Sequence, residues 1–482
     1  MVAAFGSKNL SAAFLFLLLG ACGDDAAQPV GGEGEGGTAE VAGGRGGGGE
    51  ANEGGASTAA IQFFVNERPH DAASQEKPAT HARYTDPIRV VTSGLVAGST
   101  VRFDTFSGEA MSYAIFDVPS DGVIDFARDA PTDGSWSGAD PDGFLWSLDS
   151  MAALAVKVSA RTNAGELLAS ALLERAPFAE GTLSEIVDDG TLVGTFYRPE
   201  GDGPFPAVLT FGGSEGGRES GEFTAAYLAT LGYAALGVAY FGEPGLPAVL
   251  TDVPIEILEA DIAWLRAHPD VDPSRIGVWG GSRGGELSLI LAARDAELRA
   301  IIAEVPSGYV WGSSAQIDRA AWTVGGVELP YVHAAGEGYE IFTDELGTHI
   351  ATTPGFYVDI QEATMSELEQ ARIHVEDAGA PIMFIAGSDD QLWPSCVLSE
   401  VAMDVLIASG HADTYGDELH CYESAGHWIG LPGSSTLSSQ RFFDADGGYW
   451  VEIGGTPAGV AAAQRDSNTK MRAFLERTLG ER

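Results

Sequence analysis

The sequence predicts an α/β fold over residues 179–482, preceded by an immunoglobulin-like antiparallel β-sandwich over residues 61–178. Three observations support this prediction. From about residue 179 onward, short apolar runs alternate with helical stretches, which is typical of a mainly parallel sheet covered by helices. Before that point, short alternating runs are separated by turn residues, as in β-sandwiches. Finally, a Gly-x-Ser-x-Gly sequence at residues 280–284 lies between an apolar run and a helical stretch.

The composition limits the kinds of partner that the folded part can have. The chain has 482 residues, of which 45% are hydrophobic, an ordinary composition for a soluble protein of roughly two or three domains. Its 69 acidic and 26 basic residues give a formal net charge of −43. A surface with this charge repels nucleic acid and anionic membranes, so we exclude both as partners of the folded part.

Residues 1–21 have the pattern of a signal peptide. Lys8 supplies a positive charge, and the apolar run that follows is too short to span a bilayer, which takes about 20 residues. The run ends in Leu-Gly-Ala-Cys, which resembles the lipobox of bacterial lipoproteins. This resemblance implies cleavage before Cys22, lipid on its sulfur, and an extracytoplasmic protein anchored in the bacterial cell envelope. The alternative is a plain secretory signal with a chance cysteine.

Residues 22–60 predict a disordered tether between this signal and the folded part. The segment is rich in Gly, Ala and Glu and contains no aromatic residue. Such a composition cannot bury enough apolar surface to offset the entropy lost on ordering. A lipid anchor followed by a spacer is a coherent pair of features.

The predicted sandwich contains short strands and no cluster of residues suited to catalysis. Turn sequences such as Ser120-Asp-Gly and Asn163-Ala-Gly separate the strands or follow them. Trp136 and Trp146 are interpreted as core residues. The clearest strand candidates are residues 88–91, 100–103, 113–116 and 155–158.

The α/β part contains a series of apolar runs that predict the strands of one sheet. Helical stretches lie between them, notably residues 255–266 and 401–408. A long interruption, residues 309–375, is expected to form either a lid over a pocket or a surface excursion. The predicted strands are residues 207–211, 234–239, 276–279, 300–303, 382–385 and 419–422.

Residues 280–284 predict a nucleophile elbow, a strained strand-to-helix turn that lifts a serine hydroxyl above the sheet. The apolar run 276–279 precedes Ser282, and the helix-forming stretch 286–293 follows it. Small residues are needed in this turn because neighbouring backbone packs closely. A second Gly-x-Ser-x-Gly match, around Ser214, also follows a strand but is succeeded by polar residues before any helix. We therefore interpret Ser282 as the nucleophile.

Such an elbow indicates an α/β-hydrolase, in which an acid and then a histidine follow the nucleophile along the chain. Asp389 and Asp390 both come after the apolar strand 382–385. We favour Asp390 because Gly-x-x-Asp is the usual register in this fold. Asp389 is then interpreted as a turn or cap residue.

His427 is the predicted base. It lies in the loop just past the last predicted strand, where its ring can reach over Ser282. His420 falls within that strand and His411 in the polar segment before it, so both are weaker candidates. His427 would take the serine proton, and Asp390 would hold the imidazole in the required tautomer.

This chemistry also needs an oxyanion hole. It requires neither a cofactor nor a metal. Backbone N–H groups at the start of a helix and in a neighbouring loop are the usual donors to the developing anion. The predicted donors are the backbone N–H of Arg283 and one from Gly213 or Ser214.

Several separated segments, in order, resemble the family of acyl-CoA thioesterases and bile acid-CoA:amino acid N-acyltransferases. The resemblance covers most of the chain after the tether and implies a serine hydrolase of acyl thioesters that works through an acyl-enzyme. The family divides by nucleophile, with Cys in the conjugating acyltransferases and typically Ser in the thioesterases, so Ser282 favours hydrolysis. The segments that carry the resemblance are Asp125-Phe-Ala-Arg-Asp-Ala-Pro, Gly143-Phe-Leu-Trp-Ser-Leu, Gly281-Ser-Arg-Gly-Gly-Glu-Leu, Asp389-Asp-Gln-Leu-Trp-Pro-Ser and Cys421-Tyr-Glu-Ser-Ala-Gly-His.

The substrate is left open by the charge of the chain. CoA carries several phosphates, which a protein at −43 repels unless a local basic patch intervenes. Arg218 and Arg283 are candidates for such a patch, or are salt-bridge partners. An extracytoplasmic carboxylesterase on non-CoA esters is therefore the alternative, and a tethered binding protein without turnover is a third. Cys396 and Cys421 are either paired or two buried thiols.

Overall fold

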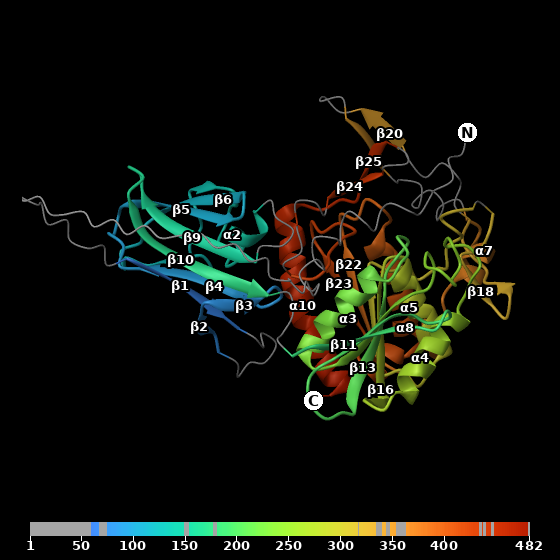
Figure 1. The fold of residues 1–482 in the computed structure, drawn as a ribbon. Helices are drawn as coiled ribbons and strands as arrows, with labels where there is room; N and C mark the ends of the chain where they lie inside the picture. Colours follow the sequence, from blue (N-terminus) through green and yellow to red (C-terminus); the bar gives the residue numbers. More distant parts are fainter. Residues whose placement is uncertain are drawn as a thin grey trace, which may run out of the picture.

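The computed structural model of the chain has two parts, each built on its own sheets (Figure 1). Residues 1–58, which include the predicted signal peptide, Cys22 and nearly all of the predicted tether, lie outside the described residues. No helix in the described part of the chain is long and apolar enough to cross a membrane. The described residues are 59–66, 75–148, 154–176, 181–316, 318–333, 340–343, 348–352, 363–432, 436, 440–444 and 448–480.

The first part is the antiparallel β-sandwich that the sequence predicts. The sandwich consists of two sheets. One has four strands in the order β2-β1-β4-β7, and the other has six strands in the order β3-β10-β9-β5-β6-β8. Pairing is antiparallel throughout these sheets except between β3 and β10. The strands are β1 (Ala60–Val65), β2 (Lys77–Ala79), β3 (His81–Arg83), β4 (Ile88–Ser93), β5 (Thr100–Ser107), β6 (Ala110–Asp117), β7 (Ile124–Asp125), β8 (Asp133–Gly134), β9 (Ala155–Thr162) and β10 (Leu167–Ala176).

An aromatic cluster fills the sandwich. Phe126 packs edge-to-face on Phe103 at 5.1 Å and stacks on Phe116 at the same centroid distance. It also contacts Trp136 at 5.7 Å and Phe144, on the short helix α2 (Gly143–Trp146), at 6.0 Å. All five rings are buried, and such offset and edge-on pairs add to the stabilisation from burial alone. Trp136 is thus a core residue, as predicted.

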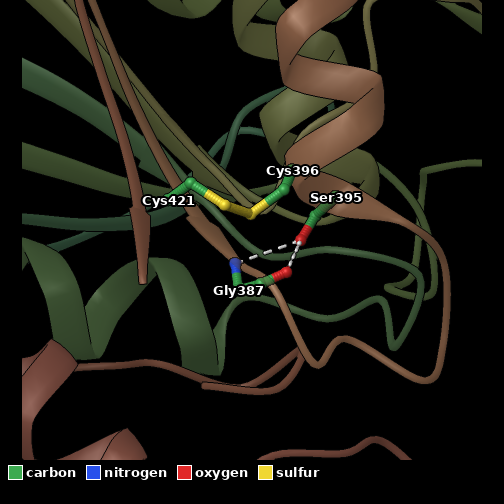
Figure 2. The surroundings of a disulfide bond; sticks show 4 residues. All are labelled: Gly387, Ser395, Cys396 and Cys421. Carbon is green, nitrogen blue, oxygen red and sulfur yellow. Dashed lines mark hydrogen bonds between the residues drawn. A yellow bond between two sulfur atoms is a disulfide. The ribbon is translucent and has the colours of Figure 1, made fainter. Parts of the chain in front are cut away.

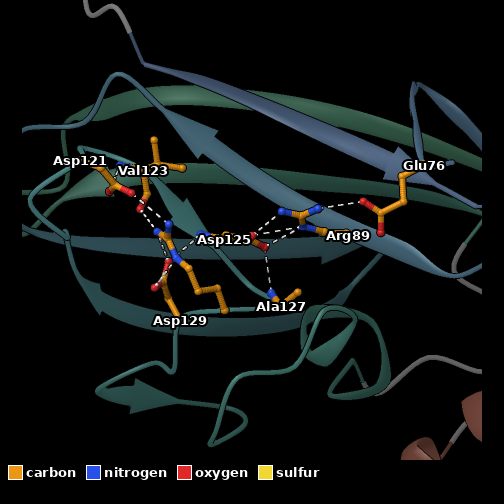
Figure 3. A network of polar contacts seen from close by, with 8 residues as sticks. Glu76, Arg89, Asp121, Val123, Asp125, Ala127 and Asp129 are labelled. Atoms are coloured by element: carbon orange, nitrogen blue, oxygen red, sulfur yellow. Dashed lines mark hydrogen bonds and ion pairs between the residues drawn. The ribbon is translucent and has the colours of Figure 1, made fainter.

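A polar network on the four-stranded sheet includes Asp125 and Asp129 of the segment 125–131 (Figure 3). The guanidinium of Arg89 on β4 donates to both carboxylate oxygens of Asp125, at 3.0 and 2.6 Å, and also to Glu76 at 2.8 Å. Arg128 pairs with Asp121 at 3.0 Å and with Asp129 at 2.8 Å. Burial alone would raise the pKa of Asp125, but the hydrogen bond from Arg89 holds it below its usual value. This network ties the segment to the sheet.

The second part is an α/β-hydrolase fold built on an eight-stranded sheet. Its order is β11-β12-β14-β13-β16-β17-β22-β23, so that only the third and fourth strands exchange places. β11, β12 and β14 pair antiparallel, and all later pairs are parallel. The strands are β11 (Leu183–Asp188), β12 (Val193–Arg198), β13 (Phe205–Phe211), β14 (Ala234–Ala239), β16 (Val271–Gly281), β17 (Ala300–Glu304), β22 (Ile382–Gly387) and β23 (Glu418–Tyr422).

Helices cover both faces of this sheet because alternate strand residues point to opposite sides. Leu209 on β13 belongs to the core under α4, α5 and α8, whereas its neighbour Val208 belongs to the core under α3 and α10. The helices are α3 (Glu219–Leu231), α4 (Glu256–Ala267), α5 (Arg283–Arg294), α8 (Ser395–Ser409), α9 (His411–Tyr415) and α10 (Pro457–Leu479).

The long helix α10 lies between the two parts (Figure 1). Its Asn468 and Arg472 donate to Thr85, to the backbone oxygen and the hydroxyl respectively, each at 3.3 Å. Its Arg465 pairs with Asp140 at 3.3 Å, beside α2. The C-terminal helix therefore fixes the sandwich to the hydrolase fold.

Residues 309–375 are in part an integral piece of the hydrolase fold. Trp322 is buried in the core under α4, α5 and α8, and Trp311 packs on Trp393 and α8. A three-stranded sheet, β15-β18-β19, and a four-stranded sheet, β20-β21-β25-β24, join these residues to other segments. The expectation of a lid or a surface excursion is incomplete, because the beginning of the insertion is core. The elements are β15 (Val253–Pro254), β18 (Trp322–Val324), β19 (Val327–Glu328), β20 (Glu340–Thr343), β21 (His349–Thr352), α7 (Met365–Ala371), the 3-10 helix η1 (Val375–Asp377), β24 (Arg441–Asp444) and β25 (Tyr449–Glu452).

Candidate active site

Ser282 sits in a strained turn between β16 and α5. Its backbone has φ 56° and ψ −120°, a conformation that side-chain-bearing residues rarely adopt. Such a conformation persists only where surrounding contacts determine it. Here the N–H of Ser282 donates to the carbonyl oxygen of Glu304 at 2.9 Å, and its own carbonyl accepts from Glu286 in the first turn of α5. The turn therefore has the geometry of a nucleophile elbow.

Two glycines make this turn sterically feasible. A Cβ on Gly280 would lie 2.4 Å from the carbonyl oxygen of Gly284, and one on Gly284 would lie 2.3 Å from that of Gly212. By contrast, the nearest atom to a Cβ on Gly281 is 4.0 Å away. The helix begins at Arg283, three residues before the helix-forming stretch that starts at residue 286. Its first turn contains Gly284 and Gly285, which the sequence alone does not mark as helical. Poor helix formers stand there because close backbone contacts leave no room for side chains.

Ser282, His427 and Asp390 come together at the carboxyl edge of the sheet. The Nε2 atom of His427 lies 2.9 Å from Ser282 Oγ, and its Nδ1 atom lies 2.8 Å from Asp390 Oδ2. With the proton on Nδ1, the ring donates to the carboxylate and accepts from the serine hydroxyl. The buried Asp390 also accepts from the backbone N–H groups of Leu392 at 3.0 Å and Trp393 at 3.2 Å. These bonds fix the orientation of the carboxylate.

The weaker sequence candidates are engaged elsewhere. Asp389 accepts from the N–H of Gly455 at 3.1 Å, as a turn residue does. His420 pairs with Glu418 at 2.9 Å, within β23. His411 lies between Asp417 and the carbonyl oxygen of Ala378, at 2.7 and 2.9 Å, and is buried there. The structure brings none of these three residues to Ser282.

The predicted oxyanion donors lie around Ser282 but differ in their state. Arg283 is the first residue of α5, and the first N–H groups of a helix have no acceptor within the helix. A Cβ on Gly213 would lie 3.0 Å from Ser282 Cβ, so this loop is directly beside the serine. However, the N–H of Gly213 donates to both carboxylate oxygens of Glu215, each at 3.0 Å. Gly213 can act as a donor only after Glu215 releases it. Ser214 is exposed in the same loop.

The side chain of Arg283 points into the protein, so of the two roles that the sequence leaves open the structure shows the salt-bridge partner. Its guanidinium donates to the carbonyl oxygens of Trp311 at 2.8 Å and Gly312 at 3.1 Å, and pairs with Glu286 at 3.3 Å. Burial raises the pKa of Glu286 to about 7, against the opposing effects of Arg283 and of the indole N–H of Trp322. The arginine anchors the insertion to the elbow.

Arg218, the other candidate for the local basic patch, pairs with Glu222 on α3 at 3.4 Å and remains partly exposed. It is therefore a salt-bridge partner in this structure.

A disulfide links the elements that precede the histidine and follow the acid (Figure 2). Cys396, at the start of α8, is bonded to Cys421 on β23, with their Cα atoms 5.6 Å apart. Beside it, the Ser395 hydroxyl lies 3.3 Å from the N–H of Gly387, at the end of β22. Of the two states that the sequence leaves open, the structure contains the disulfide. It holds α8 against β23.

Two residues that contact the serine or histidine segments, Trp393 and Glu304, were not predicted from the sequence. The indole ring of Trp393 lies edge-on to the His427 ring, at 5.9 Å between centroids. The carboxylate of Glu304 accepts from the N–H of Gly430, in the loop that carries His427. One signal was available, because Glu304 is an acidic residue that ends an apolar strand at the carboxyl edge, where parallel sheets place their ligands.

Fold and site together define the chain as an α/β-hydrolase with a serine at its elbow. Residues 253–481 match the family model described as "BAAT / Acyl-CoA thioester hydrolase C terminal". Residues 85–182 match the model described as "Acyl-CoA thioester hydrolase/BAAT N-terminal region". The chain therefore belongs to the family of acyl-CoA thioester hydrolases and bile acid-CoA:amino acid N-acyltransferases, as the resemblance predicts.

Curated relatives match this chain over most of their own length. Acyl-coenzyme A thioesterase 5 of Mus musculus is 27% identical over 433 residues, which cover 84% of this chain and 96% of the relative. Acyl-coenzyme A thioesterase 1 of Homo sapiens is 28% identical, over 84% of this chain and 96% of the relative. The mitochondrial acyl-coenzyme A thioesterase 2 of Homo sapiens is 28% identical, over 84% of each chain.

The two glycines before Ser282 provide a matched test of the elbow. Gly280→Ala places a methyl group 2.4 Å from backbone, so the strand or the helix must move, and we expect a loss of roughly 2–4 kcal/mol of stability. In Gly281→Ala the nearest atom to the new methyl group lies 4.0 Å away. Its free energy of unfolding is therefore expected to stay within about 0.5 kcal/mol of the wild-type value. Thermal and urea unfolding of the two variants measures this difference. Equal stabilities would contradict the packing described here.

Proposed function

We propose that this protein hydrolyses acyl thioesters through an acyl-enzyme formed on Ser282. It is a hydrolase of thioester or ester bonds, so the proposal concerns the bond that is cleaved and the residues that cleave it. One observation carries it: the His427 ring is hydrogen-bonded to Ser282 on one side and to Asp390 on the other. That arrangement allows a hydroxyl to lose its proton as it attacks.

The proposed reaction has two halves. Ser282 Oγ attacks the acyl carbon while His427 Nε2 takes the hydroxyl proton, and the anion forms beside the N–H of Arg283. His427 then gives the proton to the departing sulfur, which leaves as a thiol. Water, deprotonated by the same ring, then attacks the acyl-enzyme. The bond between the acyl carbon and Ser282 Oγ breaks, the ring returns the proton to this oxygen, and the acid leaves. Asp390 keeps Nδ1 protonated and stabilises the imidazolium in both halves.

The nucleophile supports hydrolysis over transfer to an amino acid. In the family that this chain resembles, the conjugating acyltransferases carry Cys, whereas the elbow here carries Ser282. The curated relatives cited above are named acyl-coenzyme A thioesterases, which supports the same bond as the substrate here.

A second candidate function is a carboxylesterase on esters without CoA. The buried guanidinium of Arg283 is occupied by carbonyl oxygens and Glu286, so it is not offered to phosphate. With a formal net charge of −43, the chain as a whole repels a polyanionic substrate. The chemistry of Ser282 serves either class of ester.

A fluorophosphonate probe tests the catalytic group. We expect wild-type enzyme to be labelled and Ser282→Ala to lose labelling completely, because the probe reacts with an activated serine. Ser214→Ala, in the second Gly-x-Ser-x-Gly sequence, is the matched control and should keep both labelling and activity. Asp390→Asn is expected to lower kcat about 10⁴-fold and Asp389→Asn far less. An unlabelled wild type would favour the non-catalytic binding protein instead.

Substrate class is decided by comparing kcat/KM for an acyl-CoA with that for a p-nitrophenyl ester of equal chain length. If the thioesterase proposal is right, the acyl-CoA is preferred at low and at high salt. If charge repulsion dominates, kcat/KM for acyl-CoA rises steeply with salt, since salt screens the repulsion, while that for the neutral ester does not. A preference for the neutral ester at every ionic strength would replace thioesterase by carboxylesterase.

We also propose that the protein is an extracytoplasmic lipoprotein anchored through Cys22. The lipobox-like sequence before Cys22 supports this location. The disulfide between Cys396 and Cys421 supports it independently, since disulfides persist mainly in oxidising compartments.

Anchoring is tested by the substitution Cys22→Ser in the full-length chain expressed in a bacterium. The wild type is expected in the membrane fraction, with incorporation of radiolabelled palmitate, because two or more acyl chains are needed for stable attachment. Cys22→Ser should incorporate no label, whereas the double variant Cys396→Ser/Cys421→Ser should stay labelled. Recovery of unlabelled wild type from the soluble periplasm would instead support a plain secretory signal.

A further inference from the structure

The end of β17 contacts the loops that carry both the serine and the histidine. The backbone oxygen of Glu304 accepts from the N–H of Ser282 at 2.9 Å. Its carboxylate accepts from the N–H of Gly430 at 2.8 Å, in the loop that carries His427. One residue on a neighbouring strand therefore holds the nucleophile through its backbone and the base through its side chain.

The next residue extends the same corner to the acid loop. Val305 has φ 40°, an outlier for a β-branched residue, so contacts around it must hold the strain. Its N–H donates to the carbonyl oxygen of Ile385 at 2.6 Å, and its own carbonyl accepts from the indole of Trp393 at 2.9 Å. The backbone N–H of Trp393, in turn, donates to Asp390. A strained backbone at a site of this kind points to a functional reason for retaining it.

The charge of the Glu304 carboxylate also interacts with the His427 ring. Burial raises the pKa of its carboxyl, while the N–H of Gly430, the indole of Trp279 and a positive charge on His427 oppose that rise. The carboxylate and the protonated ring therefore stabilise each other.

Other charged groups near His427 come from three further elements. Asp390 binds Nδ1 from the loop after β22, and Glu215, in the loop after β13, accepts from the N–H of Gly213 beside Ser282. The guanidinium of Arg283 on α5 is turned away, toward the carbonyl oxygens of Trp311 and Gly312. Among these described groups, Asp390 and Glu304 act on the ring, and the guanidinium of Arg283 is bound elsewhere.

We propose that Glu304 is a positioning residue for His427, which holds the histidine loop through Gly430 and stabilises the imidazolium with a second carboxylate. This inference rests on the proposed function and deepens it. The proton still passes from Ser282 Oγ to His427 Nε2 and on to the leaving group; Glu304 exchanges no proton. Both carboxylates favour the imidazolium that forms when Ser282 loses its proton.

Glu304→Gln separates the charge from the hydrogen bond, because the carboxamide oxygen can still accept from Gly430. We expect unchanged thermal unfolding, a roughly tenfold lower kcat with KM little changed, and an acidic limb of the kcat/KM–pH profile that lies at lower pH. The sign follows because loss of a nearby negative charge disfavours the protonated ring. Glu423→Gln, an exposed carboxyl in the stretch just before His427, is the matched control and should behave as wild type.

Glu304→Ala removes the acceptor as well, so a further fall in kcat is expected, with KM again little changed. Wild-type kcat and an unshifted limb in Glu304→Gln would overturn the charge role; wild-type kcat in Glu304→Ala would overturn the positioning role. If the alanine variant fails to fold, the glutamine variant decides alone. If the single variant Ser282→Ala retains activity, the proposed function itself is contradicted. If Ser282→Ala is inactive but the single variant Glu304→Gln behaves as wild type, only this inference is contradicted.

Discussion

The site depends on one steric constraint, the close approach of three backbone segments around Ser282. The first turn of α5 can lie against the end of β13 only because Gly284 presents no Cβ to the carbonyl oxygen of Gly212. The same packing turns the chain back at Gly280 and holds Ser282 in its rare backbone conformation. With the serine raised to the carboxyl edge, the loops after β22 and β23 can reach it. Each other member of the group therefore takes its position from this turn.

The electrostatics of the site run against the charge that the reaction creates. In the proposed reaction an oxyanion must form in a protein with a formal net charge of −43, with Asp390 and Glu304 acting on the histidine and Glu215 bound to Gly213 beside the serine. The start of α5 supplies positive potential beside Ser282, because its first N–H groups have no acceptors within the helix. Gly213 contributes only when Glu215 leaves its N–H. The acids thus favour the protonated histidine, while the anion depends on oriented backbone.

Much of this site was predictable because its residues are tied to local patterns. Ser282 stands between an apolar strand and a helix, and Asp390 and His427 each follow a strand at the expected place in the chain. The edge strand β11 was not predictable, since nearly all of its side chains are exposed and it shows no alternation. Nor was the role of α10, whose contacts with Thr85 join residues far apart in sequence. The role of Arg283 stayed open for the same reason: a sequence shows a charge but not the carbonyl groups that fold back to bind it.

The disulfide connects the geometry of the site with the compartment in which it would work. Cys396 lies a few residues after Asp390, and Cys421 a few residues before His427, so the bond joins the chain on the far sides of the acid and base loops. A covalent link there limits how far α8 and β23 can separate, and the hydrogen bond between His427 and Asp390 requires that they stay together. In a reducing compartment the bond would be lost and noncovalent packing would carry that constraint alone. The same bond therefore restrains the two loops and would persist in the oxidising surroundings of the proposed extracytoplasmic location.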